Sequence, residues 1–554
     1  MVTYRIRKMI AWGMAVTMTA GMTNVLTGCG AEREGQAVET SQVEDTSQGD
    51  EDTPAWKKYA GEPVTLDWYV NYSWFAIPWG ENAVSQKITE ETGVNINFIT
   101  PIGNETEKLN ALIASDSLPD LITLGYWEPQ VNQMIEENMV YALNELADDY
   151  DAYFWQVTDA DVVNWYTMDD GNIYGYPCST VTPKQVKEHD DIISNQTFLV
   201  RKDIYEAIGS PDMTTPEGFK AAVEKAAEMF PEVNGEKLIP VGSHVFDNQG
   251  NVSFDKYLMN FLAVPWEKDG KYYDRYTDPE YVIWLKMFRE LGEEGLLAND
   301  IFVDTRIQME EKLAKGRYFC MLYQYSDMIS QQKALYENDP DSIYMAVEGP
   351  RNSNGDDPTL STNNVNGWTL TLISKNCKYP ERAIAFMDYM MSEHGQMLIY
   401  LGVEGVTYDI VDGKPVLKED VRKILNSDRE TYDRLYGADD AYWMLQNNVM
   451  QLQWKQKAGP ATEQLLEWAC KYTVYNGQYD VSLSTSPEIA AMDEKCTKLW
   501  SETLPKLLLA PDEVQFDEIF EEFVEKRNAM GYQEVLKQKT VLMNAAKEKM
   551  GISE

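Results

Sequence analysis

Histidine, cysteine and positive charge are all scarce in this sequence. Only three histidines and six cysteines occur among 554 residues. The histidines form no HExxH arrangement and the cysteines form no CxxC pair, so we expect no metal site of these familiar spacings. The five cysteines after residue 29 are scattered and odd in number, which argues against a disulfide framework and favours buried free thiols: Cys178, Cys320, Cys377, Cys470 and Cys496.

The shortage of positive charge restricts the possible partners. The chain has 48 Lys and Arg against 90 Asp and Glu, for a formal net charge of −42. Removal of residues 1–28 takes away three positive charges and no acid, which shifts this value to −45. Such a surface repels phosphate backbones, so nucleic acid is not expected as a partner. It also disfavours acidic glycans unless the binding site is locally basic, while neutral ligands remain open.

The N-terminus has the pattern of a secretory signal. Arg5, Arg7 and Lys8 precede a mostly apolar run over residues 9–25, which is too short to make a good membrane-spanning helix. The run ends in Leu26-Thr27-Gly28-Cys29, which resembles a bacterial lipobox. We therefore interpret residues 1–28 as a lipoprotein signal peptide and Cys29 as the lipidated first residue of the mature protein. An ordinary secreted protein that keeps a cysteine near its cleavage site is the alternative.

The segment after Cys29 lacks apolar periodicity. It is rich in Ser, Thr, Gln, Asp and Glu and includes the acidic run Asp50-Glu51-Asp52. Such a segment cannot bury enough apolar surface to fold. We interpret residues 29–58 as a disordered acidic tether that holds the rest of the chain clear of the membrane.

The remaining chain is too long for one hydrophobic core, so we expect two large lobes or two to three domains. Hydrophobic residues make up 44% of the sequence and aromatic residues 12%, including 15 Trp and 33 Tyr, which is enough to bury a substantial interior. We find no internal repeat.

The first lobe reads as alternating strands and helices. Strands are predicted over residues 64–70, 94–99 and 121–124, separated by helices over 81–92, which ends at Gly93, and 105–115. This rhythm is typical of a parallel α/β sheet, in which the loops after the carboxyl ends of the strands form the binding crevice. These loops contain five aromatic residues: Tyr72, Trp74, Trp79, Tyr126 and Trp127.

Several segments resemble, in order, the extracellular solute-binding proteins of ABC importers, family 1, and in particular the oligosaccharide-binding lipoproteins of Firmicutes. The clearest is Ser115-Asp116-Ser117-Leu118-Pro119-Asp120-Leu121-Ile122, which matches the pattern sG-x-lPDii. The other segments are residues 170–177 (DGNIYGYP), 197–205 (TFLVRKDIY), 313–321 (LAKGRYFCM), 367–383 (GWTLTLISKNCKYPERA) and 402–406 (GVEGV).

The resemblance implies an α/β, periplasmic-binding-protein-like fold: two α/β lobes joined by interlobe crossings, with an extended helical C-terminal part. The crossings are expected near residues 178–195, 315–322 and 366–375. The lobes are expected to comprise residues 59–185 and 320–370 for the first, and 190–318 and 372–554 for the second.

Helix starts in the later part of the chain are marked by proline. Thr215-Pro216-Glu217 and Asp278-Pro279-Glu280 each predict one, the second ending near Gly292. Tyr379-Pro380-Glu381 predicts a third that ends at Gly395.

Aromatic rings are the main candidates for ligand contact. Sugars present flat C–H patches that stack on Trp and Tyr, while amides and carboxylates bind the hydroxyls. Packing in the core is an equal alternative for any single tryptophan, although Trp368 is favoured by its place at a crossing; Glu404 could instead make a structural hydrogen bond. The candidate ligand-binding residues are Trp74, Tyr126, Trp127, Trp266, Tyr323, Tyr325, Trp368 and Glu404. The tryptophans in helical patterns are interpreted as core: Trp284, Trp443, Trp454, Trp468 and Trp500.

Many members of the resembled family have an acidic calcium loop, which this chain lacks. Residues 231–237, PEVNGEK, stand at that place with too few oxygen ligands and with Lys237 among them. We infer that the metal has been lost. Residues 247–250 are too short for an EF-hand and are interpreted as a turn.

The resemblance implies a lipid-anchored receptor that captures an oligosaccharide between its lobes and delivers it to the permease subunits of an ABC importer. A monomer without a cofactor is expected, on the outer face of the cytoplasmic membrane of a Gram-positive cell. The chain has no GxSxG motif and no P-loop, but a glycosidase needs only two carboxylates, so the expectation of a non-enzyme depends on the resemblance. A peptide or other solute receptor, a secreted glycan-active enzyme and an adhesive lipoprotein remain alternatives.

Overall fold

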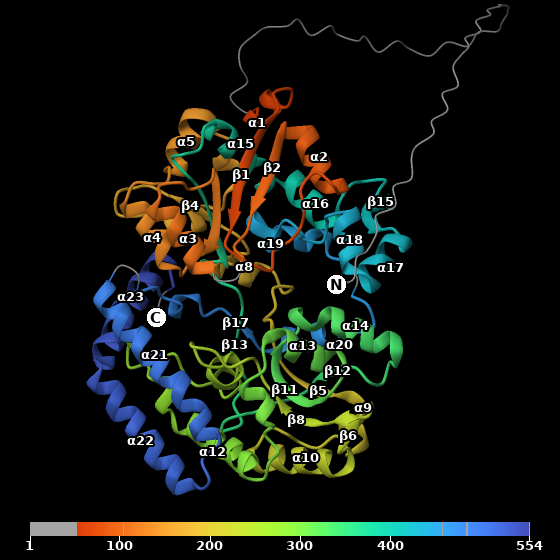
Figure 1. The fold of residues 1–554 in the computed structure, drawn as a ribbon, viewed down its shortest axis with the longest axis vertical. Helices are drawn as coiled ribbons and strands as arrows, with labels where there is room; N and C mark the ends of the chain where they lie inside the picture. The colour runs from red at the N-terminus through yellow and green to blue at the C-terminus, as the bar shows by residue number, and fades with distance from the viewer. Residues whose placement is uncertain (1–52, 103–104, 457, 484–485, 553–554) are drawn as a thin grey trace, which may run out of the picture. The chain divides into compact units, whose positions relative to one another are not determined.

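The computed structural model describes residues 53–102, 105–456, 458–483 and 486–552 (Figure 1). The described residues form one compact unit. The predicted signal peptide, Cys29 and the tether up to residue 52 lie outside the described residues. Within the described part, no helix is both long enough and apolar enough to cross a membrane.

The first lobe is built on a five-stranded sheet of order β2-β1-β3-β14-β4. Strand β1 (Val64–Val70) pairs in parallel with β2 (Val94–Ile99) and with β3 (Leu121–Gly125), whereas β14 (Thr369–Ile373) runs antiparallel between β3 and β4 (Gly175–Pro177). The two connecting helices are α2 (Ala83–Thr92), which Gly93 ends at a φ of 70°, and α3 (Glu105–Ala114). The alternation predicted for residues 64–125 is therefore confirmed.

The second lobe is built on a four-stranded sheet of order β12-β5-β11-β8. Its central strands are β5 (Gln196–Arg201) and β11 (Tyr318–Gln324), flanked by β12 (Tyr344–Ala346) and β8 (Ile239–Gly242). Residues 315–322 were predicted to cross between the lobes and residues 320–370 to belong to the first lobe. Both predictions are wrong for this part of the chain, because β11 and β12 pair with β5 in the sheet of the second lobe. A strand buried on both faces carries no mark of which sheet it joins, so periodicity alone could not assign β11.

The C-terminal third is divided between the lobes. Helices α15 (Pro380–Met391), α16 (Glu393–Leu401), α17 (Glu419–Ser427) and α18 (Arg429–Leu435) contribute Phe386, Ile399, Val421 and Tyr432 to the core of the first lobe. Trp468, Trp500 and Phe523 belong instead to the core of the second lobe. The prediction that residues 372–554 all lie in the second lobe is therefore wrong for the part up to Leu445.

The helical C-terminal part is confirmed. It consists mainly of α21 (Pro487–Leu508), α22 (Glu513–Ala529) and α23 (Tyr532–Lys549), drawn in blue in Figure 1. Helix α21 packs on α12 (Pro279–Glu293), whose Trp284 is buried in the same core as Trp500.

Three segments connect the two lobes. Residues 178–195 run from β4 to β5, and residues 362–368 run from β13 (Leu360–Ser361) to β14. Residues 446–462 lead from the short 3₁₀ helix η5 (Trp443–Leu445) to α20 (Glu463–Ala469). The first matches its prediction, the second lies a few residues before the predicted 366–375, and the third was not anticipated.

The three crossings are joined by backbone hydrogen bonds. The Ser179 N–H donates to the Gln446 carbonyl at 2.9 Å, and the Val181 N–H donates to the Asn364 carbonyl at 3.0 Å. The three segments between the lobes therefore form one hydrogen-bonded unit.

Two predicted boundaries differ from the structure. Gly395 does not end a helix: α15 stops before Ser392, whose hydroxyl accepts the Gly395 N–H and caps α16. The predicted tether ends before residue 58, because α1 (Ala55–Tyr59) docks on the first lobe. Its Ala55 N–H donates to Asp151 at 2.9 Å and the Trp56 ring meets Tyr389 edge-on.

The segment compared with a calcium loop is a tight hairpin. Strands β6 (Glu232–Val233) and β7 (Glu236–Lys237) flank Asn234 and Gly235, both at positive φ. The Glu236 carboxylate is paired with Lys315 and Arg317. Residues 247–250 form a turn closed by backbone hydrogen bonds between Asp247 and Gly250, as predicted.

Candidate functional site

Four aromatic rings gather at the carboxyl end of β1, and we call Tyr72, Trp74, Trp368 and Trp443 the aromatic platform. The rings of Trp74 and Trp368 are parallel to within 6°, with centroids 6.1 Å apart. Trp443 lies 4.5 Å from Trp368 and 5.7 Å from Trp74, and Tyr72 lies 5.3 Å from Trp368. The platform joins two predicted site residues with one tryptophan that was assigned to the core.

Strand ends and crossings position these rings. Tyr72 and Trp74 follow β1, Trp368 immediately precedes β14, and Trp443 begins η5. The Trp368 N–H donates to the Cys178 carbonyl at 3.1 Å, which ties the platform to the strand end of β4. Loops at the carboxyl ends of parallel strands are where ligands bind in open α/β sheets.

The platform offers both an exposed ring and unsatisfied donors. Trp74 is 58% exposed, whereas Trp443 is 8% exposed and forms the base. Within the described residues, the Tyr72 hydroxyl and the Trp443 indole N–H are buried without a hydrogen-bond partner. Burial, followed by the charge of Glu128, raises the pKa of Tyr72 well above its usual range, so the hydroxyl stays protonated. A buried donor without an acceptor costs about 1–3 kcal/mol, which a ligand hydroxyl could recover.

A glycine sets the backbone beside the platform, and its replacement is expected to be costly. Gly367 has a φ of +68°, and a Cβ there would lie 2.2 Å from the Cys178 carbonyl oxygen. We expect Gly367→Ala to lower the free energy of unfolding by about 3 kcal/mol, measured by chemical denaturation. Gly171→Ala is the matched control, because Gly171 also has a positive φ but no atom within 4 Å of the added Cβ. A loss of about 1 kcal/mol in both variants would contradict the steric argument.

A polar cavity of about 390 Å³ is lined by residues of all three crossings, and we call it the crossing pocket. Ser179, Asn195, Asn363 and Gln446 come from the crossings, and Tyr325 follows β11 of the second lobe. Burial raises the pKa of Tyr325 to about 12, so its phenol is a neutral hydrogen-bonding group. The predicted residue Tyr325 therefore lines a cavity, and the amides around it were missed because single Asn and Gln residues carry no sequence signal.

The loop after β3 carries Tyr126 and Trp127. The Tyr126 hydroxyl donates to Asp480 at 2.8 Å, and the Trp127 ring meets Tyr126 edge-on at 5.2 Å and remains 51% exposed. The Glu128 carboxylate accepts hydrogen bonds from the Gly125 N–H and the Asn71 amide, while burial raises its pKa. Asp480 and Glu128 were not among the predicted site residues.

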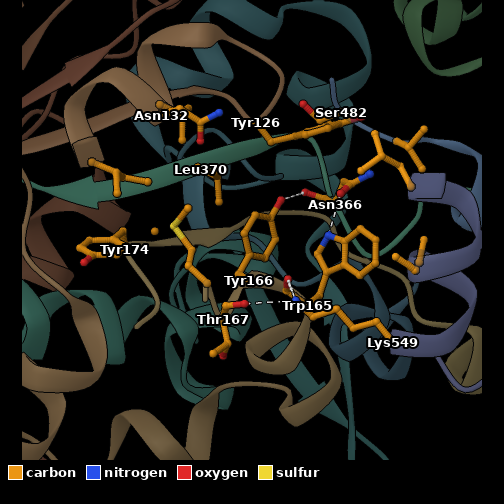
Figure 2. Close-up of a pocket in the computed structure, with 18 of the residues that line it drawn as sticks. Tyr126, Asn132, Trp165, Tyr166, Thr167, Tyr174, Asn366, Leu370, Ser482 and Lys549 are labelled. Atoms are coloured by element: carbon orange, nitrogen blue, oxygen red, sulfur yellow. Dashed lines mark hydrogen bonds between the residues drawn. The ribbon is translucent and has the colours of Figure 1, made fainter. Parts of the chain in front are cut away.

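Figure 2 shows a second cavity, of about 340 Å³, beside Tyr126. The indole N–H of Trp165 and the hydroxyl of Tyr166, both in α7 (Ala160–Tyr166), donate to Asn366 at 2.7 and 2.6 Å. The Lys549 ammonium at the end of α23 donates to the carbonyls of Trp165 and Thr167. Because these polar groups already have protein partners, they are less available for hydrogen bonds to a polar ligand than the donors of the platform are.

Three predicted residues lie away from the platform. Tyr323 is fully buried against the His244 ring, since β11 is covered on both faces, so its prediction as a ligand-contacting ring is corrected to a core position. Trp266 stacks on Tyr479 and is covered by the Arg275 guanidinium at 3.8 Å, in the second lobe. Glu404 is exposed in the loop after α16, and within the described residues it makes no contact with the four rings of the platform.

The remaining tryptophans assigned to the core are buried as predicted: Trp284, Trp454, Trp468 and Trp500. Trp443 is buried too, but its ring supports the platform. Its role depends on Trp74 and Trp368, which come from distant parts of the chain.

The pattern of one protein family, described as bacterial extracellular solute-binding protein, matches residues 77–397. The polygalacturonan/rhamnogalacturonan-binding protein YtcQ of Bacillus subtilis (strain 168) is 22% identical over 387 residues, which cover 67% of this chain and 74% of YtcQ. Lipoprotein LipO of the same organism is 21% identical over 334 residues, which cover 56% of this chain and 61% of LipO.

Among solved structures, the ABC-transporter substrate binding protein FusA of S. pneumoniae in complex with kestose matches with a TM-score of 0.67 and 15% identity. The match covers 88% of this chain and all of that one. At this level of identity the likeness shows the fold, and it confirms the predicted periplasmic-binding-protein-like architecture.

Proposed function

Since this chain belongs to the family of bacterial extracellular solute-binding proteins, we propose that its solute is an oligosaccharide bound on the aromatic platform and in the crossing pocket. The observation that carries the proposal is the platform itself, which combines an exposed Trp74 ring with two buried donors that have no partner among the described residues. Sugar rings stack their C–H faces on indoles and direct hydroxyls toward such donors. The names of YtcQ and the FusA complex, which both refer to carbohydrate ligands, support it.

The site needs no covalent chemistry. The crossings that carry Trp368 and Gln446 also join the lobes, so a ligand held there contacts the segments that would bend when the lobes close. Closure around a sugar would present a distinct form to the permease subunits of an ABC importer. The protein would act as a monomeric receptor and not as an enzyme.

The lipobox-like Leu26-Thr27-Gly28-Cys29 supports lipid attachment at Cys29 on the outer face of the cytoplasmic membrane. The acidic segment that follows would act as the tether to the folded part. Mass spectrometry of the protein from membranes tests this: a diacylated N-terminal Cys29 is expected, and an unmodified Cys29 would contradict it.

The proposal is tested by the melting temperature of the chain lacking residues 1–29 with a panel of oligosaccharides and peptides. A ligand that binds only the folded form raises this temperature. A shift with one class of sugar, recovered intact, would support the receptor. A shift with peptides alone would move the proposal to another solute, and cleaved sugar would favour a glycan-active enzyme.

Replacing Trp368 with alanine is expected to weaken sugar binding by at least tenfold, measured by calorimetry. The ring contacts Tyr72, Trp74 and Trp443, so its loss removes a stacking surface and disorders the platform. Unchanged affinity in a folded variant would remove Trp368 from the site.

A further inference from the structure

Four stretches without any ionisable Asp, Glu, Lys, Arg or His side chain meet at the proposed site. These stretches are residues 68–80, 171–183, 358–374 and 441–454, in a chain of which 25% is Asp, Glu, Lys or Arg. Each contributes directly: the first holds Tyr72 and Trp74, the third holds Trp368, and the fourth holds Trp443. The second supplies Cys178 and Ser179.

Hydrogen bonds connect the second stretch to the third and to the fourth. Cys178 and Trp368 are joined by a backbone hydrogen bond of 3.1 Å, and Ser179 and Gln446 by one of 2.9 Å. The Asn363 side-chain amide donates to the Ser179 carbonyl at 3.3 Å. Segments that are far apart in the sequence thus form one surface without Asp, Glu, Lys, Arg or His around the platform.

The crossing pocket has the same character. Its polar lining consists of amides and hydroxyls: Ser179, Asn195, Tyr325, Ser326, Asn363, Gln446 and Asn448. One carboxylate, Asp191, is also part of the lining, and it lies 3.3 Å from the Lys455 ammonium. The lining therefore contains no lysine or arginine that could pair with an anionic ligand.

Several charged groups beside this surface are carboxylates or cations held by carboxylates. Glu105 accepts hydrogen bonds from Ser73, which lies in the sequence between the platform residues Tyr72 and Trp74. Glu128 accepts one from Asn71. In the second lobe, Arg306 is paired with both Glu310 and Asp327, beside the pocket residue Ser326. An approaching anion meets negative potential from the first lobe and no unpaired cation among these groups.

We infer that the oligosaccharide bound by this chain is uncharged, and that uronate-containing sugars are excluded by the site. This inference rests on the proposed function and narrows it. A uronate carboxylate would lose its hydration in a pocket lined by amides without gaining a counter-charge, which is costly. Sugar hydroxyls, in contrast, match amide, hydroxyl and indole groups. YtcQ is named for an acidic polymer, so this chain would differ from that relative in the charge of its ligand.

The test uses matched ligands that differ only in charge. Neutral oligosaccharides are screened first, together with oligogalacturonides and their carboxyl-reduced forms, in which CH₂OH replaces each carboxylate. Binding to the mature chain is measured by calorimetry and by the melting temperature. We expect at least one neutral sugar to bind, and each acidic sugar to bind at least a hundredfold more weakly than the best neutral one.

The outcomes separate the two proposals. If an acidic sugar binds as tightly as its neutral counterpart or better, the inference is overturned while the proposed receptor stands. If no carbohydrate of either kind binds, the proposed function fails, and the inference fails with it.

A variant with an added charge tests whether the crossing pocket determines the preference for neutral over acidic sugars. Asn448→Lys places an ammonium in the crossing pocket and is expected to narrow the preference for neutral over acidic sugars by at least tenfold. Gln533→Lys, on the exposed side of α23, adds the same charge elsewhere and should leave the preference unchanged. Equal effects of the two substitutions would overturn the role of the pocket.

Discussion

Replacing Trp74 with alanine is expected to lower the affinity for the bound sugar about a hundredfold, while the melting temperature of the free protein stays within about 1 °C. Trp74 is 58% exposed, so its removal leaves no cavity in the core. It lies parallel to Trp368 at the edge of the platform, where a sugar ring can stack on it. Loss of an aromatic anchor from a binding site can cost 2 kcal/mol or more, and about 2.7 kcal/mol corresponds to a hundredfold in affinity.

The control is another exposed tryptophan with an aromatic neighbour. Trp155 in α6 (Phe154–Val157) is 42% exposed, contacts Phe154 edge-on and has no contact with the platform rings among those described. Calorimetric titration of Trp74→Ala and Trp155→Ala with the sugar found in the screen should show a loss only in the first. An equal loss in both, or none in Trp74→Ala, would show that the platform is not where the sugar stacks.

Stability is expected to fall as the pH rises from 5 to 8.5, and Asp440→Asn should remove a large part of that fall. Burial, followed by the charge of Asp439, raises the pKa of Asp440 to about 8. In the unfolded chain an aspartate has a pKa near 3.9. Between these values the folded state holds a proton that the unfolded state has released, so the stabilisation present at low pH is lost as the pH rises through about 8.

Two more buried carboxyls act in the same direction. Burial raises the pKa of Asp255 to about 7, and burial together with the nearby charge of Asp151 raises the pKa of Asp388 well above its usual range. Repulsion among the 90 acidic residues adds to the same trend, so the slope alone does not identify the groups responsible. A substitution is needed to separate them.

Asp440→Asn suits this purpose. Part of the residue reaches the surface, but the carboxyl is enclosed and accepts the Gln451 amide at 2.7 Å, a bond that an asparagine oxygen can also accept. Asp440 has a φ of 58°, a conformation that asparagine tolerates well. We expect a gain on the order of 2 kcal/mol at pH 8.5 and little change at pH 5, measured by urea denaturation. Asp149→Asn removes one charge from an exposed side chain, and a similar gain there would indicate general repulsion instead.

Local rules were sufficient for the secondary structure of residues 64–125 in the first lobe. The bounds of β1 and β2 follow from short apolar runs, and Gly93 ends α2 because it adopts a positive φ. The helix N-termini capped by Thr215 and Asp278 were predicted equally well, because a side-chain oxygen and a following proline act within one turn. The same rules failed at Gly395, where Ser392 starts a new helix before the glycine is reached.

The sequence predicted only part of the candidate site. Trp74 was found because it follows a predicted strand and Trp368 because it lies at a predicted crossing, and the structure brings them together. Trp443 was assigned to the core, since nothing in its own neighbourhood distinguishes a buried ring that packs from one that supports a binding surface. Tyr323 was assigned to the crevice because β11 was taken for a crossing, whereas its pairing with β5 and β8 buries it.

The sequence by itself determined the alternation of strands and helices, the acidic character of the chain, the lipobox-like N-terminus and the resemblance to solute-binding proteins. These properties depend on neighbours within a turn, a strand or a short motif. Only the tertiary structure decided which sheet receives β11, how residues 372–554 divide between lobes, and which four uncharged stretches converge. Those outcomes depend on contacts between residues more than a hundred positions apart, such as Tyr72 with Trp368 and Ser179 with Gln446. The energies of such contacts exist only once the chain is folded, and no local pattern encodes them.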